Sequence, residues 1–262
     1  MRVVNGLRVM TFGIAMLVAM PAVRSMRSEE IPVKYREGTT HAFLILRSTN
    51  KTDIGSGELT ELPAGDDRVS VKFTLHFKDG SIYEESSTFS QGGTLRLLTY
   101  HLLEKGPTFP QAQDVSIDPP KGNVTVGYIG TDGARKTIEK HMNIPPDVAN
   151  GIVPFVVRNI SPAKSANVSI VATTPKPRLV RLSIAPAGED AFASGDGKQE
   201  ATRFVIKVQV GGVAGVAANA FGKVPPDSYV WMSRGGVAHV HEVAAVFDRR
   251  ARLRGRIGCA AG

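Results

Sequence analysis

The sequence predicts a mainly β protein: a single antiparallel, strongly curved sheet or a barrel-like sandwich, with one helix near the middle of the chain. Three observations lead to this fold class. Apolar and polar residues alternate with a period of two through most of the chain, which is typical of half-buried strands. The alternating stretches recur about every 8 to 15 residues, with glycine, proline or aspartate turn signals between them. A helical pattern stands out in a single segment, at about 146–159.

The first 25 residues have the layout of an export signal. A positively charged start with Arg2 and Arg8 precedes an apolar run over 9–20, and small residues follow up to Ser25. The apolar run is shorter than the roughly 20 residues that a membrane-spanning helix needs. The pattern therefore predicts a cleaved signal peptide over 1–25, and a mature protein that is periplasmic or secreted, with no transmembrane segment.

The clearest strand covers 69–78, where apolar and polar side chains alternate without a break. Asp79-Gly80 follows, a dipeptide favoured in two-residue hairpin turns because both residues need positive φ. The return strand is expected over 81–89. One face of the first strand is entirely apolar: Val69, Val71, Phe73, Leu75 and Phe77.

Other elements follow from the same patterns. Further strands are expected over 41–47, 95–103, 115–117, 124–128, 136–141, 168–172, 179–185 and 204–210. Pro146 and Asp147 can begin and cap the helix, which is expected to end near Asn159, although Gly151 and Pro154 weaken its pattern. The apolar phases predict a core that includes Phe73, Leu75, Phe77, Phe155, Phe204 and Ile206.

The charge distribution argues against a nucleic-acid-binding protein, and the cysteine content argues against a disulfide-stabilised one. The formal net charge is +8, but 1–25 contribute three positive charges and 233–262 contribute four, so 26–232 is nearly neutral. A nucleic-acid-binding surface is therefore not expected on the folded part. The chain has one cysteine, Cys259, so no internal disulfide is possible and stability must come from burial of the core.

The C-terminal segment 233–262 differs in composition from the domain at 26–232. It is rich in arginine, alanine and glycine, contains no lysine, and its strand alternation fades after Trp231. We expect it to be disordered and dispensable, as an inert extension such as a shifted reading frame of a GC-rich gene would encode. The alternative is a basic arm that binds anionic lipid or nucleic acid.

No catalytic or metal-binding motif is recognisable. The sequence lacks G-x-S-x-G and H-E-x-x-H, Gly211–Gly215 lacks the spacing of a dinucleotide-binding loop, and Gly222-Lys223 lacks the residues of a P-loop. His239 and His241, with Glu242 beside them, have metal-ligand spacing but fall in the segment 233–262, which is expected to be disordered. We expect neither a metal nor a cofactor.

A candidate ligand pocket follows from the register of the hairpin. With a two-residue turn, His76 lies opposite Tyr83, and Leu75 lies opposite Glu84, so Glu84 points to the apolar face. A buried carboxylate needs a partner, such as Arg96, or a hydrated cavity. One extra loop residue would turn Glu84 outward. The predicted pocket residues are Glu84, Tyr83, His76, His101 and Arg96.

Eight segments of the chain carry a family resemblance: Phe77–Ser81, Thr88–Gln91, Tyr100–Pro110, Pro145–Gly151, Thr174–Arg178, Gly211–Gly215, Gly222–Asp227 and Val230-Trp231. Together they resemble a group of uncharacterised exported bacterial β-rich proteins of unknown function. The resemblance spans about 41–232, and the sequence departs from the group after Met232. It implies a curved antiparallel sheet and a periplasmic location, and it carries no activity.

The sequence leaves three functional hypotheses open. The first is a non-enzymatic envelope protein that binds lipid or another apolar or amphiphilic small molecule, or another envelope protein. The second is a hydrolase-like enzyme that uses a histidine–glutamate pair on the strands at 69–103. The third is a purely structural domain without a pocket. The enzyme would be built on His76, Tyr83, Glu84, Glu85 and His101.

Overall fold

The computed structural model describes residues 29–48, 50, 52–173, 176–194, 197–209, 227–233, 240–248 and 251–259. The expected signal peptide, the glycine-rich segments at 211–215 and 222–223, and His239 lie outside the described residues. For 240–248 and 251–259 the structure describes the backbone alone.

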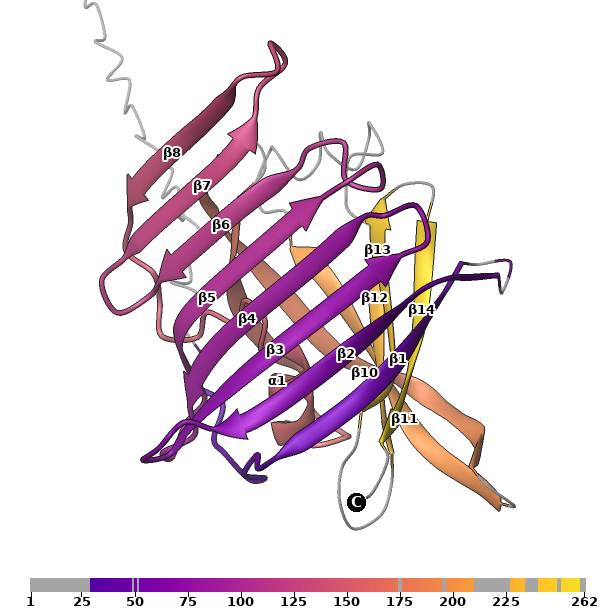
Figure 1. Cartoon of the computed structure of the whole chain (residues 1–262). Coiled ribbons are helices and arrows are strands. Elements are labelled where there is room, and N and C mark those ends of the chain that lie inside the picture. Colours follow the sequence, from indigo (N-terminus) through magenta and orange to yellow (C-terminus); the bar gives the residue numbers. More distant parts are fainter. Residues whose placement is uncertain are drawn as a thin grey trace, which may run out of the picture.

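The described residues form fourteen strands and one helix (Figure 1). In order they are β1 (Thr40–Arg47), β2 (Asp53–Pro63), β3 (Arg68–Phe77), β4 (Ile82–Ser90), β5 (Arg96–Lys105), β6 (Gln113–Asp118), β7 (Asn123–Ile129), β8 (Arg135–His141), α1 (Val153–Asn159), β9 (Ala166–Ala172), β10 (Arg178–Ser194), β11 (Gly197–Gln209), β12 (Ser228–Ser233), β13 (Val240–Asp248) and β14 (Ala251–Cys259).

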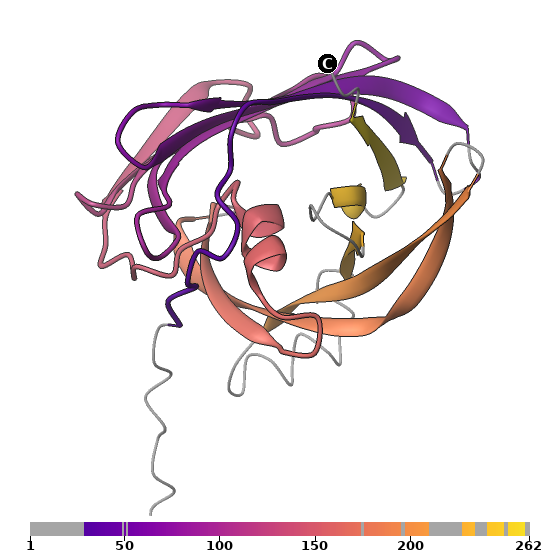
Figure 2. The same ribbon diagram turned by 90° about the horizontal axis from the view of Figure 1, so that it is seen from below.

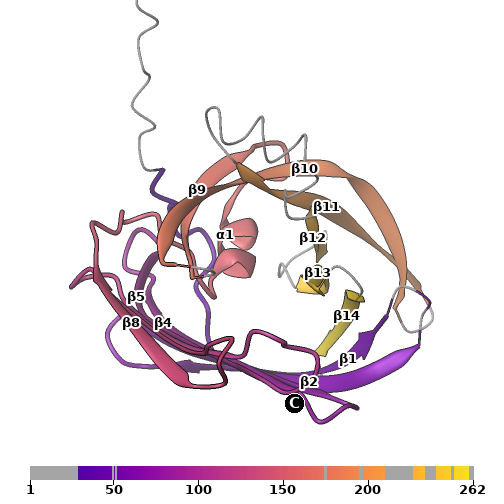
Figure 3. The ribbon, with the colours of Figure 1, turned by 90° about the horizontal axis from the view of Figure 1, so that it is seen from above.

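All strands belong to one sheet, in the order β8-β7-β6-β5-β4-β3-β2-β1-β14-β13-β12-β11-β10-β9. Each strand pairs antiparallel with its neighbours. The sheet curls until its two edge strands, β8 and β9, lie on the same side of the molecule (Figure 3). The predicted fold class, a strongly curved antiparallel sheet with one helix, is confirmed.

The helix lies inside the curl, on the concave face of the sheet (Figure 2). The Phe155 ring packs on Phe89 of β4, with ring centroids 4.9 Å apart. The helix begins at Val153 rather than at 146, so the predicted start is wrong. Gly151 has φ +70°, a left-handed conformation that ends the preceding turn, and Pro154 then fits the first helical turn.

The concave face carries the core. Of the six predicted core residues, Leu75, Phe77, Phe155 and Phe204 are buried. Phe73 and Ile206 face the same side but are only partly buried. The apolar phase of β3 is therefore confirmed, and part of the concave face remains in contact with solvent.

Strand β2 was missed because it has little apolar alternation and two glycines. Both glycines are required by the close approach of β2 to β3. A Cβ at Gly55 would lie 2.3 Å from the carbonyl oxygen of His76, and one at Gly57 would lie 2.5 Å from Leu75 Cδ2. Such glycines mark tight backbone contact within a sheet.

The expected disorder of the tail is wrong for 240–248 and 251–259. The backbones of these segments form β13 and β14, which lie between β12 and β1 in the sheet. Residues 42–47 of β1 pair with 254–259 of β14. Backbone pairing satisfies the β1 edge whatever the side-chain composition, which explains why an arginine-rich segment can complete the sheet.

Side chains and turns close the two edges of the sheet. Asn150 donates to the carbonyl of Val171 (3.0 Å) and accepts from its N–H (2.8 Å), so its side chain imitates a neighbouring strand along β9. On the other edge, Lys140 Nζ of β8 donates to the carbonyl of Pro177 at 2.8 Å. These contacts join or cover edges that would otherwise expose backbone groups.

The N-terminal segment 29–39, here called the strap, crosses beside α1 (Figure 2). Its backbone bonds to the turn between β4 and β5: Val33 N–H donates to Gly93 and Leu95 N–H donates to Ile31, both at 2.9 Å. The Asn159 side chain of α1 accepts from the N–H groups of Lys34 and Tyr35. The strap therefore ties the helix to the sheet.

Candidate functional site

The hairpin between β3 and β4 decides which acidic residue enters the concave face. Phe77 N–H donates to Ser81 O at 3.0 Å, and Gly80 adopts φ +84°. The loop is therefore three residues long, a turn completed by a left-handed glycine. This adds one residue to the expected two-residue turn, so Leu75 lies opposite Tyr83 and Thr74 lies opposite Glu84.

The predicted position of Glu84 is therefore wrong. Glu84 points to the outer face, where it pairs with Lys72 at 3.2 Å. Glu85 points to the concave face instead, opposite Phe73. A shift of one residue in register exchanges the two faces of a strand, so the two glutamates exchange roles.

The other predicted pocket residues do not meet. His76 is exposed on the outer face, and His101 bonds Asp114 there at 2.9 Å. Arg96 does not reach Glu84; it donates to Glu30 of the strap at 2.5 Å. Tyr83 alone among the five predicted residues lies on the concave side. The structure thus separates the histidines from Tyr83 and Glu85, on which the hydrolase hypothesis depended.

The polar groups that do meet on the concave face form a cluster of Tyr83, Glu85, Tyr100, Glu104 and Gln113, here called the Glu85 cluster. Tyr100 donates to Glu85 Oε1 at 2.8 Å. Gln113 Nε2 donates to Glu104 Oε2 at 2.7 Å, and Thr173 after β9 donates to Gln113 Oε1 at 2.8 Å. The network spans β4, β5 and β6 and reaches the far edge of the sheet.

Burial dominates the electrostatics of this cluster. Desolvation raises the pKa of Glu85, hydrogen bonds from Tyr100 and Tyr83 partly oppose the rise, and the nearby Glu104 adds to it. Desolvation also raises the pKa of Glu104, against the bond from Gln113. The pKa values of Tyr83 and Tyr100 are raised by burial and by Glu85. The two phenols are therefore neutral donors, and each carboxyl holds its proton to a higher pH than an exposed one.

Aromatic rings surround the cluster on its apolar side. Phe109, in the loop between β5 and β6, packs edge-on against Phe77, with ring centroids 5.5 Å apart, and lies 6.2 Å from Tyr83. Tyr83 in turn lies 6.0 Å from Phe73. Leu59 of β2 lies opposite Phe73, and both are partly buried. Apolar and hydrogen-bonding groups thus share one partly solvated face.

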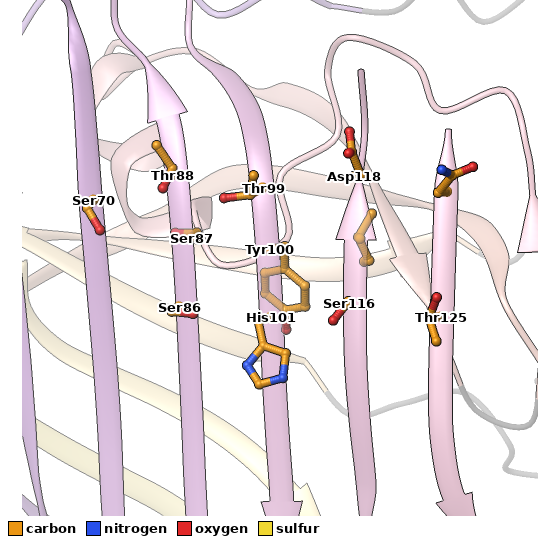
Figure 4. Close-up of a pocket in the computed structure, with 12 residues that line it drawn as sticks. Ser70, Ser86, Ser87, Thr88, Thr99, Tyr100, His101, Ser116, Asp118 and Thr125 are labelled. Carbon is orange, nitrogen blue, oxygen red and sulfur yellow. The ribbon is translucent and has the colours of Figure 1, made fainter. Parts of the chain in front are cut away.

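A depression of about 460 Å³ lies across β3 to β7, with the outer-face side chains of these strands along it (Figure 4). His101 is the predicted pocket residue that lines it. Most of its lining residues carry hydroxyl groups: Ser70, Ser86, Ser87, Thr88, Thr99, Tyr100, Ser116 and Thr125. Tyr100 of the Glu85 cluster also lines this depression, next to His101 on β5.

A second buried charge cluster fixes the strap. Glu37 of the strap pairs with Arg158 of α1, and their side chains are 1% and 15% exposed. Glu61 of β2 is also buried and near both. Desolvation raises the pKa of Glu37 to about 7, opposed by Arg158 and reinforced by Glu61. Two carboxyls thus share one guanidinium, which makes this cluster sensitive to pH.

The described part of the chain has no helix with the length and apolar character of a membrane span. It also contains no group of three or more histidine, cysteine, aspartate or glutamate side chains placed to hold a metal ion. The fold and the site together define a β-rich protein with a single curled antiparallel sheet, whose concave face carries a polar cluster among aromatic rings.

No family model and no curated protein matches this sequence. Among solved structures, the chain is similar to the crystal structure of a β-barrel-like protein of a domain of unknown function, DUF1849, from Brucella abortus. The TM-score is 0.46 and the sequence identity 10%, with 87% of this chain and 100% of that chain covered.

Proposed function

We propose that this chain is a non-enzymatic protein of the bacterial envelope that binds an amphiphilic molecule on the concave face of its sheet. The observation that carries the proposal is the Glu85 cluster: hydrogen-bonding groups placed among apolar side chains that solvent partly reaches. An amphiphile matches both parts, because its chain can cover Phe73 and Leu59 while its polar end reaches Tyr100 and Glu85. The export signal expected at 1–25 supports a periplasmic location.

Binding of a fluorescent amphiphile to the purified protein tests this function. Leu59→Trp adds bulk to the concave face beside Phe73, whereas Thr60→Trp adds the same bulk on the opposite face of the same strand. We expect the native protein and Thr60→Trp to bind the probe, and Leu59→Trp to bind at least about tenfold more weakly. Equal binding by the two variants, or no binding by the native protein, would contradict the proposal.

The hydrolase hypothesis has no comparable support. Its histidines, His76 and His101, lie on the face opposite Tyr83 and Glu85. General acid–base catalysis needs its groups within hydrogen-bond reach of one substrate atom. A purely structural domain is the outcome that the absence of any binding would favour.

A further inference from the structure

We propose that the polar end of the bound amphiphile is an ammonium group, received by Glu85 and Glu104. This inference rests on the proposed function and names the chemical class of its ligand. It follows from an imbalance of charge on the concave face, from the nature of the groups that contact the two carboxyls, and from the rings around them.

The two carboxyls are neighbours. Tyr83 lies opposite Glu104, and Glu85 lies opposite Leu102, so Glu85 and Glu104 are diagonal neighbours on one face of the β4–β5 pair. Side chains in this relation come within reach of each other. A group placed between them can therefore contact both.

The described groups that act on these carboxyls are neutral or negative. Besides burial, the pKa of Glu85 is shifted by Tyr100, Tyr83 and Glu104, and the pKa of Glu104 is shifted by Gln113. Lys72 of β3 pairs with Glu84 on the outer face. Burying a carboxylate without an opposite charge is costly, so the site is most stable when it is protonated or when a cation enters it.

An ammonium group satisfies both the charge and the geometry. It can donate hydrogen bonds to the two carboxylates, and neighbouring tyrosine and phenylalanine rings attract cations. The ring centroid of Tyr83 lies 6.0 Å from that of Phe73 and 6.2 Å from that of Phe109. A carboxylate or phosphate end would instead face two acids, which like-charge repulsion disfavours.

Proton linkage gives the site a pH dependence. Tyr83 and Glu85 from β4, Tyr100 and Glu104 from β5, and Gln113 from β6 are the polar groups that face the ligand. Burial raises the pKa of both carboxyls. An ammonium ion favours their ionised form, so its binding releases protons. Affinity for the ammonium ion should therefore rise with pH, while affinity for an uncharged amphiphile changes little.

Three ligands with the same alkyl chain separate these possibilities: decylammonium, decanol and decanoate, each measured by calorimetry with the full mature chain. At about pH 8 we expect decylammonium to bind about tenfold or more tightly than decanol, and decanoate to bind most weakly. The preference should shrink at about pH 5, where the carboxyls are protonated.

Variants assign the effect to the two residues. Glu85→Gln and Glu104→Gln should each remove most of the preference for decylammonium over decanol. Glu84→Gln, one residue away on the outer face, should leave this preference unchanged. If one glutamine variant does not fold, the other variant and the pH dependence of binding to the native protein still test whether these carboxyls receive the ammonium group.

The outcomes are distinguishable. Binding of all three ligands with equal affinity overturns the ammonium inference but keeps the proposed function. A preference for decylammonium that both glutamine variants retain also overturns it, because the selectivity would then lie elsewhere. Failure of every ligand to bind overturns the proposed function and this inference with it.

Discussion

The strap gives the sharpest prediction about stability. Glu37 is buried against Arg158, with Glu61 nearby, and its pKa is raised from 4.5 to about 7. In the unfolded chain Glu37 returns to its ordinary pKa. A group whose folded pKa is raised stabilises the fold fully below the unfolded pKa, and this contribution is lost as pH rises through the folded pKa. The native protein should therefore lose stability between about pH 4.5 and about pH 7.

The size of this loss of stability follows from the unfolded and folded pKa values of Glu37. At about 1.4 kcal/mol for each pKa unit, the interval from 4.5 to about 7 corresponds to about 3 kcal/mol in the free energy of unfolding. Glu37→Gln removes this titration and leaves Arg158 with Glu61, a balanced pair. The variant should match the native protein near pH 4.5 and exceed its stability by up to about 3 kcal/mol near pH 8.

Urea unfolding at fixed ionic strength, followed by the fluorescence of Trp231, measures this difference across the pH range. Trp231 is the one tryptophan of the chain and is buried in β12. Glu58→Gln is the control, because Glu58 lies on the same strand as Glu61 but is exposed on the outer face. Parallel pH curves for the native protein and Glu37→Gln, or a uniform loss of stability in the variant, would refute the reasoning.

Three further predictions follow from the fold. Phe204→Ala should cost about 3–5 kcal/mol in the free energy of unfolding, because Phe204 is 1% exposed. Phe73→Ala should cost less, because Phe73 is only partly buried. Equal costs would contradict the difference in burial between the two rings. Asn150→Ala should cost about 1–3 kcal/mol in urea unfolding, because the N–H and carbonyl of Val171 lose their partner at the β9 edge; an unchanged midpoint would show that water replaces the side chain. Truncation after Ser233 removes β13 and β14 and leaves β1 and β12 each unpaired along one edge, so the thermal midpoint should fall by more than about 10 °C. An unaltered melting curve would instead support a dispensable tail.

The sequence predicted much of the fold because period-two alternation reports directly on which side chains face a core. The β3 phase from Val69 to Phe77 and the buried Phe155 and Phe204 are confirmed for this reason. Strand β2 was missed because Gly55 and Gly57 serve the approach to β3, and glycine carries no apolar signal.

The candidate site was harder to predict because it depends on a single residue of register. Asp79-Gly80 is compatible with a two-residue turn, but the structure uses a three-residue loop, which brings Glu85 rather than Glu84 to the concave face. Tyr100, Glu104 and Gln113 were missed because the pairing of β4, β5 and β6 brings them together, not a motif along the chain.

The C-terminal strands show a different limit. Their composition indicated an extension without structure, because arginine, alanine and glycine dominate residues 233–262. The backbone of β14 nevertheless pairs along six residues of β1. Backbone hydrogen bonding is open to nearly every residue type, so a sheet can recruit a segment whose composition alone gives no strand signal.

Native mass spectrometry of the protein purified from the cells that naturally make it tests the central claim, that the concave face holds an amphiphile, most directly. We predict a bound small molecule that organic solvent releases and that carries an alkyl chain. The same molecule should be retained by Thr60→Trp and lost from Leu59→Trp. A native protein that carries no ligand and takes up no amphiphile on addition, or a ligand that Leu59→Trp retains in full, would contradict the account.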